Sequence, residues 1–307
     1  MKVISLFCGA GGLDLGFIKA GHKIVWANDF DKDSVETYKN NIGKHVICKD
    51  ITKVKSKDIP NADIVIGGFP CQGFSIANTL RNENDKRNKL YLELIRIIKD
   101  KQPKIFVAEN VPGIKSLAKG KVFELILKDF TSLGYDLKYE ILNSADYGTP
   151  QCRKRIIFFG VRQDINKNFN FPPCQTFSDD KQNTLLYKPW RTVKDAISDL
   201  PEPTEQIPNH IGNKHKVKIN GYMGNRITSW DKPSPTIVGR GGGTGGPVII
   251  PHPNLKRRLT PRECARLQDF PDDFIFYGSI SSQFRQIGNA VPINLAYAIA
   301  KLIPKKL

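Results

Sequence analysis

The chain has 307 residues, and its 47 Lys and Arg against 30 Asp and Glu give a formal net charge of +17. This balance favours a polyanionic partner, nucleic acid or an anionic membrane surface, and does not distinguish between them. No apolar run approaches the roughly 20 residues that a membrane-spanning helix requires. The short apolar start is broken by glycines from Gly9 onward, so it predicts a buried strand and not a signal peptide. The six cysteines form no CxxC pair, which argues against zinc and a disulfide framework and favours a reducing cytoplasm.

Short apolar runs alternate with amphipathic stretches over the first half of the chain. Strands are expected at 2–7, 23–27, 46–48, 63–66, 104–108, 137–142 and 156–161, and helices at 13–20, 34–40, 89–101 and 121–133. Alternation of this kind predicts an α/β fold with a Rossmann-like, doubly wound and mostly parallel sheet.

The composition changes after the Pro pair at 172–173. Residues 175–258 are rich in Pro, Asn, Gly and Lys and show little periodicity, which predicts a smaller, loop-rich second domain. The glycine-rich run at 239–246 is expected to form a loop between strands at 236–238 and 248–250, although such runs are often only flexible linkers. Helices are expected again at 261–268 and 290–302.

Three features lie at the ends of the first three expected strands. A glycine-rich turn with Gly9, Gly11 and Gly12 follows the first strand, Asp29 follows the second and Asp50 the third. A turn of this kind presents backbone N–H groups to a ligand, and a carboxylate about 20 residues later can bind ribose hydroxyls. The turn alone is equally consistent with a tight structural turn, but the three features together predict a nucleotide cofactor.

A cysteine and a carboxylate follow the next two strands. Cys71 comes after the strand at 63–66, and Glu109 ends the strand at 104–108. A lone cysteine after a strand is usually an inert buried thiol. Because neighbouring parallel strands end at one edge of the sheet, Cys71 and Glu109 are expected to face the crevice that holds the cofactor.

These motifs and others that follow them resemble the DNA (cytosine-5) methyltransferases of bacterial restriction–modification systems. The similarity extends over nearly the whole chain in the family's order. Its motifs are the Phe-x-Gly-x-Gly-Gly turn at 7–12, Gly-Phe-Pro-Cys-Gln at 68–72, Glu-Asn-Val at 109–111, Gln151 with Arg153 and Arg155, the block that runs from Arg257 or Arg258 to Pro271, and Gly-Asn-Ala-Val at 288–291.

The resemblance implies methyl transfer from S-adenosylmethionine to C5 of a cytosine flipped out of double-stranded DNA. Cys71 would add to C6 of the base, which makes C5 nucleophilic. Glu109 would hold the N3 and 4-amino edge and supply a proton at N3. Arg153, and secondarily Arg155, would contact the base carbonyl and orient the two catalytic groups.

The resemblance also implies a set of cofactor contacts that requires no metal. Phe7 would stack on the adenine, Asp29 would bind the ribose, and Asp50 with Ile51 would contact the adenine edge. Phe30 and Leu90 would add apolar walls, and Asn289 with Val291 would close the methionine end. The remaining expected cofactor residues are Gly9, Gly11, Gly12, Leu13 and Pro70.

The family's organisation implies two domains in a monomer. Residues 1–174 and 285–307 would form the catalytic domain, and 175–284 would form the target-recognition domain. The polar segment at 73–89 is consistent with a disordered surface loop, but its place directly after Cys71 favours a mobile lid that closes on DNA. The expected DNA-binding residues are Gln72, Ser75, Arg81, Arg87, Arg226, Thr236, Ile237, Arg240, Arg257 and Arg258, among which Arg226 and Arg240 are the best candidates for base contacts because they flank Thr236 and Ile237.

Two other functions remain open on the sequence. The first is methylation of RNA cytosine at C5, because a relative of this family acts on transfer RNA. The second is a non-catalytic DNA-binding protein on the same fold, which the intact Cys71, Glu109, Arg153 and Asn289 disfavour. The glycines do not fit the dinucleotide fingerprint G-x-G-x-x-G, so a nicotinamide dehydrogenase is disfavoured as well.

Overall fold

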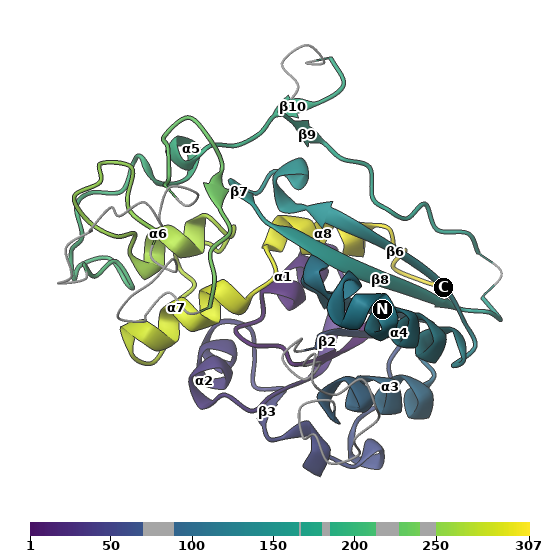
Figure 1. Cartoon of the computed structure of the whole chain (residues 1–307). Helices are drawn as coiled ribbons and strands as arrows, with labels where there is room; N and C mark the ends of the chain where they lie inside the picture. The colour runs from purple at the N-terminus through teal and green to yellow at the C-terminus, as the bar shows by residue number, and fades with distance from the viewer. Residues whose placement is uncertain (70–88, 166, 180–184, 213–226, 240–249) are drawn as a thin grey trace.

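The central element of the fold is a seven-stranded sheet (Figure 1). The computed structural model describes residues 1–69, 89–165, 167–179, 185–212, 227–239 and 250–307. Its strands are β1 (Lys2–Leu6), β2 (Lys23–Asp29), β3 (Val46–Cys48), β4 (Ile64–Gly68), β5 (Ile105–Asn110), β6 (Tyr135–Asn143) and β8 (Lys154–Arg162), in the order β3-β2-β1-β4-β5-β8-β6. The first five pair in parallel and β8 pairs antiparallel with both β5 and β6, which confirms the predicted mostly parallel sheet.

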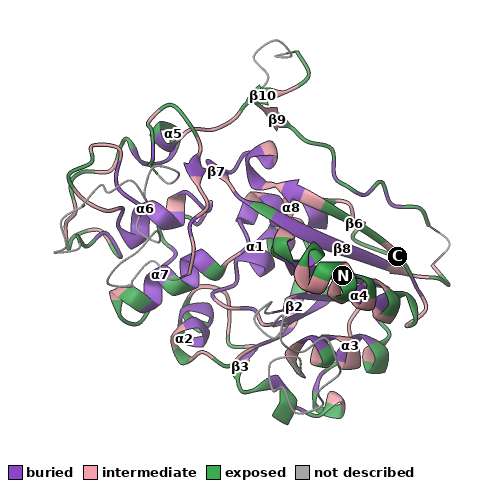
Figure 2. Cartoon of the chain, viewed as in Figure 1, coloured by how far each residue is buried: buried purple, intermediate pink, exposed green. Residues whose placement is uncertain are grey.

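Two hydrophobic cores lie on the two faces of this sheet, because successive side chains of a strand point to opposite faces. In β1, Val3 belongs to one core and Ile4 to the other. Helices α1 (Gly12–Lys19), α2 (Lys32–Asn41) and α8 (Ile293–Lys301) contribute to the first core, and α3 (Lys89–Lys101) and α4 (Lys121–Thr131) to the second. The sheet is therefore covered on both faces, and Figure 2 shows its central strands as buried.

The C-terminal helix α8 completes the larger part of the molecule by packing on α1. A Cβ atom at Gly16 would lie 2.6 Å from the Ala296 carbonyl carbon and 2.6 Å from the Tyr297 nitrogen, so this close approach of two helices requires glycine. The first and last segments of the chain thus share one core. No helix in the described part of the chain is long and apolar enough to cross a membrane.

A smaller lobe, at the left of Figure 1, contains α5 (Val193–Ile197), α6 (Pro261–Arg266) and α7 (Ile280–Asn289). Both α5 and α6 begin with capping boxes, at Thr192 and Thr260. A third hydrophobic core joins these helices and extends to Ala10 of the glycine-rich turn. The short strands are β7 (Gln151–Cys152), β9 (Phe177–Ser178), β10 (Lys188–Pro189) and β11 (Ser234–Pro235), and the 3-10 helices are Ile51–Lys53, Ser56–Asp58, Pro112–Lys115, Leu117–Gly120 and Ser144–Tyr147.

Two predictions for the second half of the chain were wrong in detail. The strand expected at 236–238 is not a strand, because its backbone groups bond to side chains of Gln151 and Arg153 and only Ser234–Pro235 pairs with β7. The helix expected at 290–302 begins only at Ile293, and the separate helix α7 precedes it. The glycine run from 240 and most of the strand expected at 248–250 lie outside the described residues.

Candidate active site

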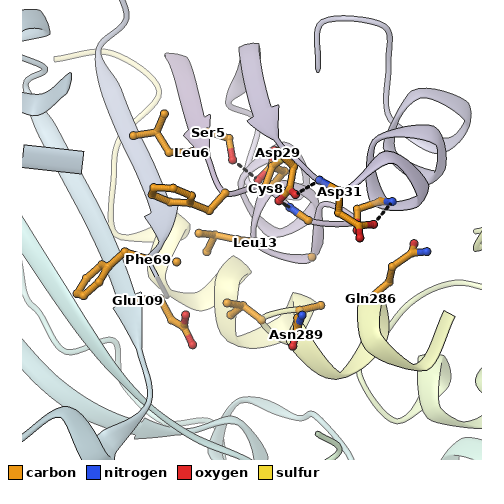
Figure 3. A pocket seen from close by; sticks show the side chains of 18 of the residues that line it. Ser5, Leu6, Cys8, Leu13, Asp29, Asp31, Phe69, Glu109, Gln286 and Asn289 are labelled. Atoms are coloured by element: carbon orange, nitrogen blue, oxygen red, sulfur yellow. Dashed lines mark hydrogen bonds between the residues drawn. The ribbon is translucent and has the colours of Figure 1, made fainter. Parts of the chain in front are cut away.

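A cavity of about 570 Å³ opens where β1, β2, β4 and β5 end. Its size is that of a site for a small organic ligand, which falls at roughly 300–1,000 Å³. Figure 3 shows Asp29, Glu109 and Asn289, which come from distant parts of the chain, around this one space. Of the predicted residues in the described ranges, those that line it are Phe7, Gly9, Gly12, Leu13, Asp29, Phe30, Leu90, Glu109, Arg153, Arg155, Asn289 and Val291.

The glycine-rich turn forms one wall of the cavity. Gly9 and Gly11 have φ angles of +53° and +91°, a backbone region that favours glycine. A Cβ atom at Gly12 would lie 2.5 Å from the carbonyl oxygen of Val291, so the turn packs directly on the segment that follows α7. Gly11 is the N-cap of α1 and does not itself line the cavity.

The end of β2 forms the adjacent wall and carries Asp29. Its carboxylate accepts hydrogen bonds from the backbone N–H groups of Gly9 (2.8 Å) and Asp31 (2.9 Å). Burial raises the pKa of Asp29. The next residue, Phe30, lines the cavity and is 70% exposed, so its ring is accessible from solvent.

A buried hydrogen-bond network that the sequence gave no reason to expect lies behind the turn. Asp14 accepts hydrogen bonds from the hydroxyl groups of Ser5 and Tyr38, both at 2.7 Å, and the Tyr38 hydroxyl also contacts His45. Burial raises the pKa of Asp14 from its usual 3.8 to about 6. Burial also raises the pKa of the Cys8 thiol, with smaller effects from Asp29 and Asp14, so this cysteine is not a reactive thiolate.

The catalytic carboxylate predicted at 109 forms an ion pair with an arginine. Arg155 Nε lies 2.7 Å from Glu109 Oε1, and both side chains are nearly buried. A Cβ atom at Gly68 would lie 2.8 Å from Glu109 Oε2, so the glycine at the end of β4 leaves space for the carboxyl group. The neighbouring Asn110 donates from its side-chain amide to the carbonyl of Phe69 (2.9 Å), which fixes the chain just before Pro70 and Cys71.

Arg153 and Arg155 lie on one face of the chain as it passes from β7 into β8, because they are two residues apart. Their contacts differ. Arg155 reaches Glu109, whereas Arg153 donates from its two terminal nitrogens to the carbonyl oxygens of Ile237 (2.5 Å) and Gly288 (2.7 Å). The structure therefore brings Arg155, and not Arg153, to the carboxylate of Glu109.

Other predicted residues lie in the described ranges without lining the cavity. Asp50 uses its carboxylate to cap a 3-10 helix through Thr52, and Ile51 is buried in the second core. Ile237 is only 2% exposed. Thr236 donates its hydroxyl to the Cys152 carbonyl, Arg257 pairs with Glu202 and Glu263, and Arg258 is partly buried.

The remaining predicted residues lie outside the described residues: Pro70, Cys71, Gln72, Ser75, Arg81, Arg87, Arg226 and Arg240. The segment predicted as a lid, 73–89, also falls outside them except at its last residue. Among the residues described, no group of three or more His, Cys, Asp or Glu could hold a metal ion.

Sequence reasoning missed several residues of the cavity wall, namely Asp14, Asp31, Arg285 and Gln286. Arg285 pairs with Asp31 at 2.9 Å, which joins α7 to the turn after β2. Arg285 and Gln286 lie on α7, the helix that was not predicted, so no periodic pattern directed attention to them.

The fold and this arrangement of strand-end residues are typical of α/β enzymes that bind a nucleotide-like ligand where the parallel strands end. Residues 1–305 match the family model described as C-5 cytosine-specific DNA methylase. The chain belongs to this family, so it is a methyltransferase.

Individual relatives agree with the family assignment. The chain is 40% identical to type II methyltransferase M.FnuDI of Fusobacterium nucleatum, across 100% of the chain and 95% of the relative. It is 38% identical to type II methyltransferase M.MthTI of Methanothermobacter thermautotrophicus, across 100% of the chain and 98% of the relative. A solved structure of a putative DNA modification methyltransferase from an Escherichia coli prophage matches with a TM-score of 0.73 and 27% identity, covering 98% of both chains.

A second solved structure supports the fold alone. The Dnmt2 methyltransferase of S. pombe matches with a TM-score of 0.75 at 20% identity, again covering 98% of both chains.

Proposed function

We propose that the chain methylates C5 of a flipped-out cytosine at a short specific site in double-stranded DNA, with S-adenosylmethionine as donor and Cys71 as nucleophile. The observation that carries this proposal is the Glu109–Arg155 pair. It lies at the edge of the sheet where β4 leads into Cys71, and it faces the cavity beside the glycine-rich turn. The natural role of the protein would be modification of DNA in a restriction–modification system, as the type II methyltransferase relatives suggest.

The residues of the cavity fit S-adenosylmethionine, which supplies an electrophilic methyl group. Phe7 and the exposed Phe30 provide aromatic faces for the adenine. Asp29 accepts one backbone N–H group at each oxygen, and its remaining lone pairs are available to ribose hydroxyls. A side chain at Gly12 would collide with Val291, so glycine lets the turn pack against the methionine-end residues Asn289 and Val291 at the cavity wall.

The chemistry follows from the poor nucleophilicity of cytosine C5. The Cys71 thiolate adds to C6, and the electron pair of the C5–C6 bond becomes available at C5 while N3 takes a proton from Glu109. C5 then takes the methyl group. Loss of the C5 proton to a base and elimination of Cys71 restore the aromatic ring and the free thiol.

Arg155 has two roles in this reaction. Its Nε–H group holds the Glu109 carboxyl group in one orientation, and its positive charge faces the base carbonyl, where negative charge develops. Arg153 instead donates to two backbone carbonyls, so it does not share these roles.

The substrate side of the proposal places DNA recognition in residues 175–284, inserted between two parts of a catalytic domain formed by 1–174 and 285–307. The net charge of +17 suits a duplex partner, because Lys and Arg displace condensed counterions from phosphates. A monomer that methylates one strand at each visit is sufficient for this reaction.

The test is methyl transfer from radiolabelled S-adenosylmethionine to unmethylated phage DNA and to RNA, followed by bisulfite sequencing. Wild type is compared with Cys71→Ser and with Cys48→Ser, which alters an exposed thiol elsewhere. We expect label on DNA cytosine at one short sequence, lost in Cys71→Ser and retained in Cys48→Ser. Label on RNA alone would refute the DNA assignment, and full activity of Cys71→Ser would refute the covalent mechanism.

A further inference from the structure

One short segment of the smaller lobe is bonded into the catalytic part of the molecule. Residues 234–239, here called the recognition stem, lie beside β7 and the end of α7. Ser234 and Pro235 pair with β7, and the Thr236 hydroxyl donates to the Cys152 carbonyl (2.8 Å). The Ile237 N–H group donates to the side-chain oxygen of Gln151 (3.0 Å), so the stem is held at four consecutive positions.

Arg153 occupies the centre of this junction. Its side chain is 1% exposed, and its terminal nitrogens bridge the carbonyl of Ile237, in the stem, and the carbonyl of Gly288, at the end of α7. Burial lowers the pKa of Arg153. Burying a charged guanidinium group costs free energy. The hydrogen bonds to the two carbonyls offset part of this cost only while both segments stay in place.

Glycines bring the same two segments into direct backbone contact. A Cβ atom at Gly288 would collide with the backbone of Val238 and Gly239, and one at Gly239 would collide with the side chain of Asn289. Asn289 lines the cavity. The stem therefore touches a cavity residue at its last described position, immediately before the glycine-rich run that begins the next segment.

Helix α7 has anchors that do not involve Arg153. Gln286 accepts a hydrogen bond from the Thr37 hydroxyl (2.6 Å) and donates to the Tyr277 carbonyl (2.8 Å). Gln268 donates to the carbonyl of Ile287. Loss of the Arg153 contacts should therefore destabilise the position of the stem more than that of the cofactor side of the cavity.

We propose that Arg153 is a positioning residue that fixes the recognition stem relative to the Glu109–Arg155 pair and the cofactor cavity, and that it does not touch the base. The proposal rests on the assignment of DNA recognition to 175–284. Arginine is required because its planar fork reaches two carbonyl oxygens at once, whereas a lysine ammonium group is a single point donor.

The first measurement is hydrogen exchange of the full chain. Arg153→Lys is compared with Arg162→Lys, which alters a partly exposed arginine at the far end of β8 that pairs with Asp164. We expect exchange of the stem amides to accelerate about 10-fold or more in Arg153→Lys, as the loss of one charged hydrogen bond implies. The central strand β5 should be unchanged, and Arg162→Lys should match wild type.

The second measurement separates DNA binding from chemistry. For Arg153→Lys with unmethylated phage DNA, we expect KM for DNA to rise about 10-fold and site discrimination to fall, since the stem loses about one charged hydrogen bond. By contrast, kcat at saturating DNA and S-adenosylmethionine affinity should stay near wild type. Gly239→Ala pushes the stem from Asn289 without altering Arg153 and should likewise raise KM for DNA and lower site discrimination.

Three results would overturn the proposal. A fall in kcat with unchanged KM and unchanged stem exchange would place Arg153 on the base. Uniformly faster exchange across β5 and the stem in Arg153→Lys would make Arg153 a general structural residue. Wild-type behaviour of Gly239→Ala in both measurements would show that the position of the stem does not control DNA binding. Because exchange and cofactor binding do not require methyl transfer, these results remain readable even if the DNA reaction itself is not found.

Discussion

The Glu109–Arg155 pair offers the sharpest test of the catalytic site. In Arg155→Lys the positive charge is kept, but a methylene group replaces Nε, the atom that lies 2.7 Å from Glu109 Oε1. A hydrogen bond to a charged group contributes about 1.5–3 kcal/mol, so the methyl-transfer rate should fall roughly 10- to 150-fold. Stability should change little, because a cation still faces the carboxylate.

The assay is single-turnover methyl transfer from labelled S-adenosylmethionine to unmethylated phage DNA. Glu109→Gln supplies the second axis of a double-mutant cycle, because it removes the proton that Arg155 is proposed to orient. In the Glu109→Gln background, Arg155→Lys should lower the methyl-transfer rate by less than about threefold, since the carboxyl group that Arg155 positions is already absent. A rate for Arg155→Lys within threefold of wild type, or fully additive losses in the double variant, would refute the reasoning.

Three further predictions concern packing, pH and the cofactor. Gly16→Ala should lower the free energy of unfolding by about 2 kcal/mol or more in urea titrations, because its Cβ atom meets the backbone of α8, whereas Gly113→Ala has no atom within 4 Å and should be near neutral. The pKa of Asp14 is raised from 3.8 to about 6, so its contribution to stability is full below pH 4 and is lost as pH rises through 6. Wild type should therefore lose about 1 kcal/mol relative to Asp14→Asn between pH 5 and pH 7 in the same titrations, and equal slopes would contradict this. Phe30→Ala should weaken S-adenosylmethionine binding about 10-fold by calorimetry, and Leu92→Ala, which is exposed outside the cavity, should not.

The sheet was predictable because its signals are local. Each expected strand of the first half has a counterpart in the structure, since apolar runs bounded by glycine or charge are visible in the sequence itself. The positions of Gly9, Asp29 and Glu109 around one cavity followed from parallel strands ending at one edge. Helix α7 was missed because six of its ten residues are polar, and Ser282, Gln283 and Gln286 are buried through hydrogen bonds that no hydropathy pattern reveals.

The roles of the two arginines could not be read from the sequence. Their spacing of two residues is that of neighbours on one face of an extended segment, so periodicity treats them alike, although Arg153 lies between β7 and β8 and only Arg155 is in a strand. Only the tertiary fold, which brings Ile237 and Gly288 to one arginine and Glu109 to the other, separates a bridge between segments from a partner of the catalytic group. The local cap that Asp50 forms through one carboxylate oxygen was likewise not read from the sequence, and its predicted contact with the cofactor stays a prediction.

The chain order itself explains how a loop-rich lobe can be held accurately against a catalytic edge. After α7, the last helix of the smaller lobe, the chain returns to the larger part of the molecule, where Val291 meets Gly12 and Ala296 of α8 meets Gly16. Both contacts are between backbones, so neither partner can shift by rotating a side chain. The smaller lobe is thereby fixed at its C-terminal end by α7 and near its middle by the stem on β7. Together with the contacts of Gln151 with Leu267 and of Thr149 with Asp269, these attachments restrict rotation as well as separation, which a single linker would not do.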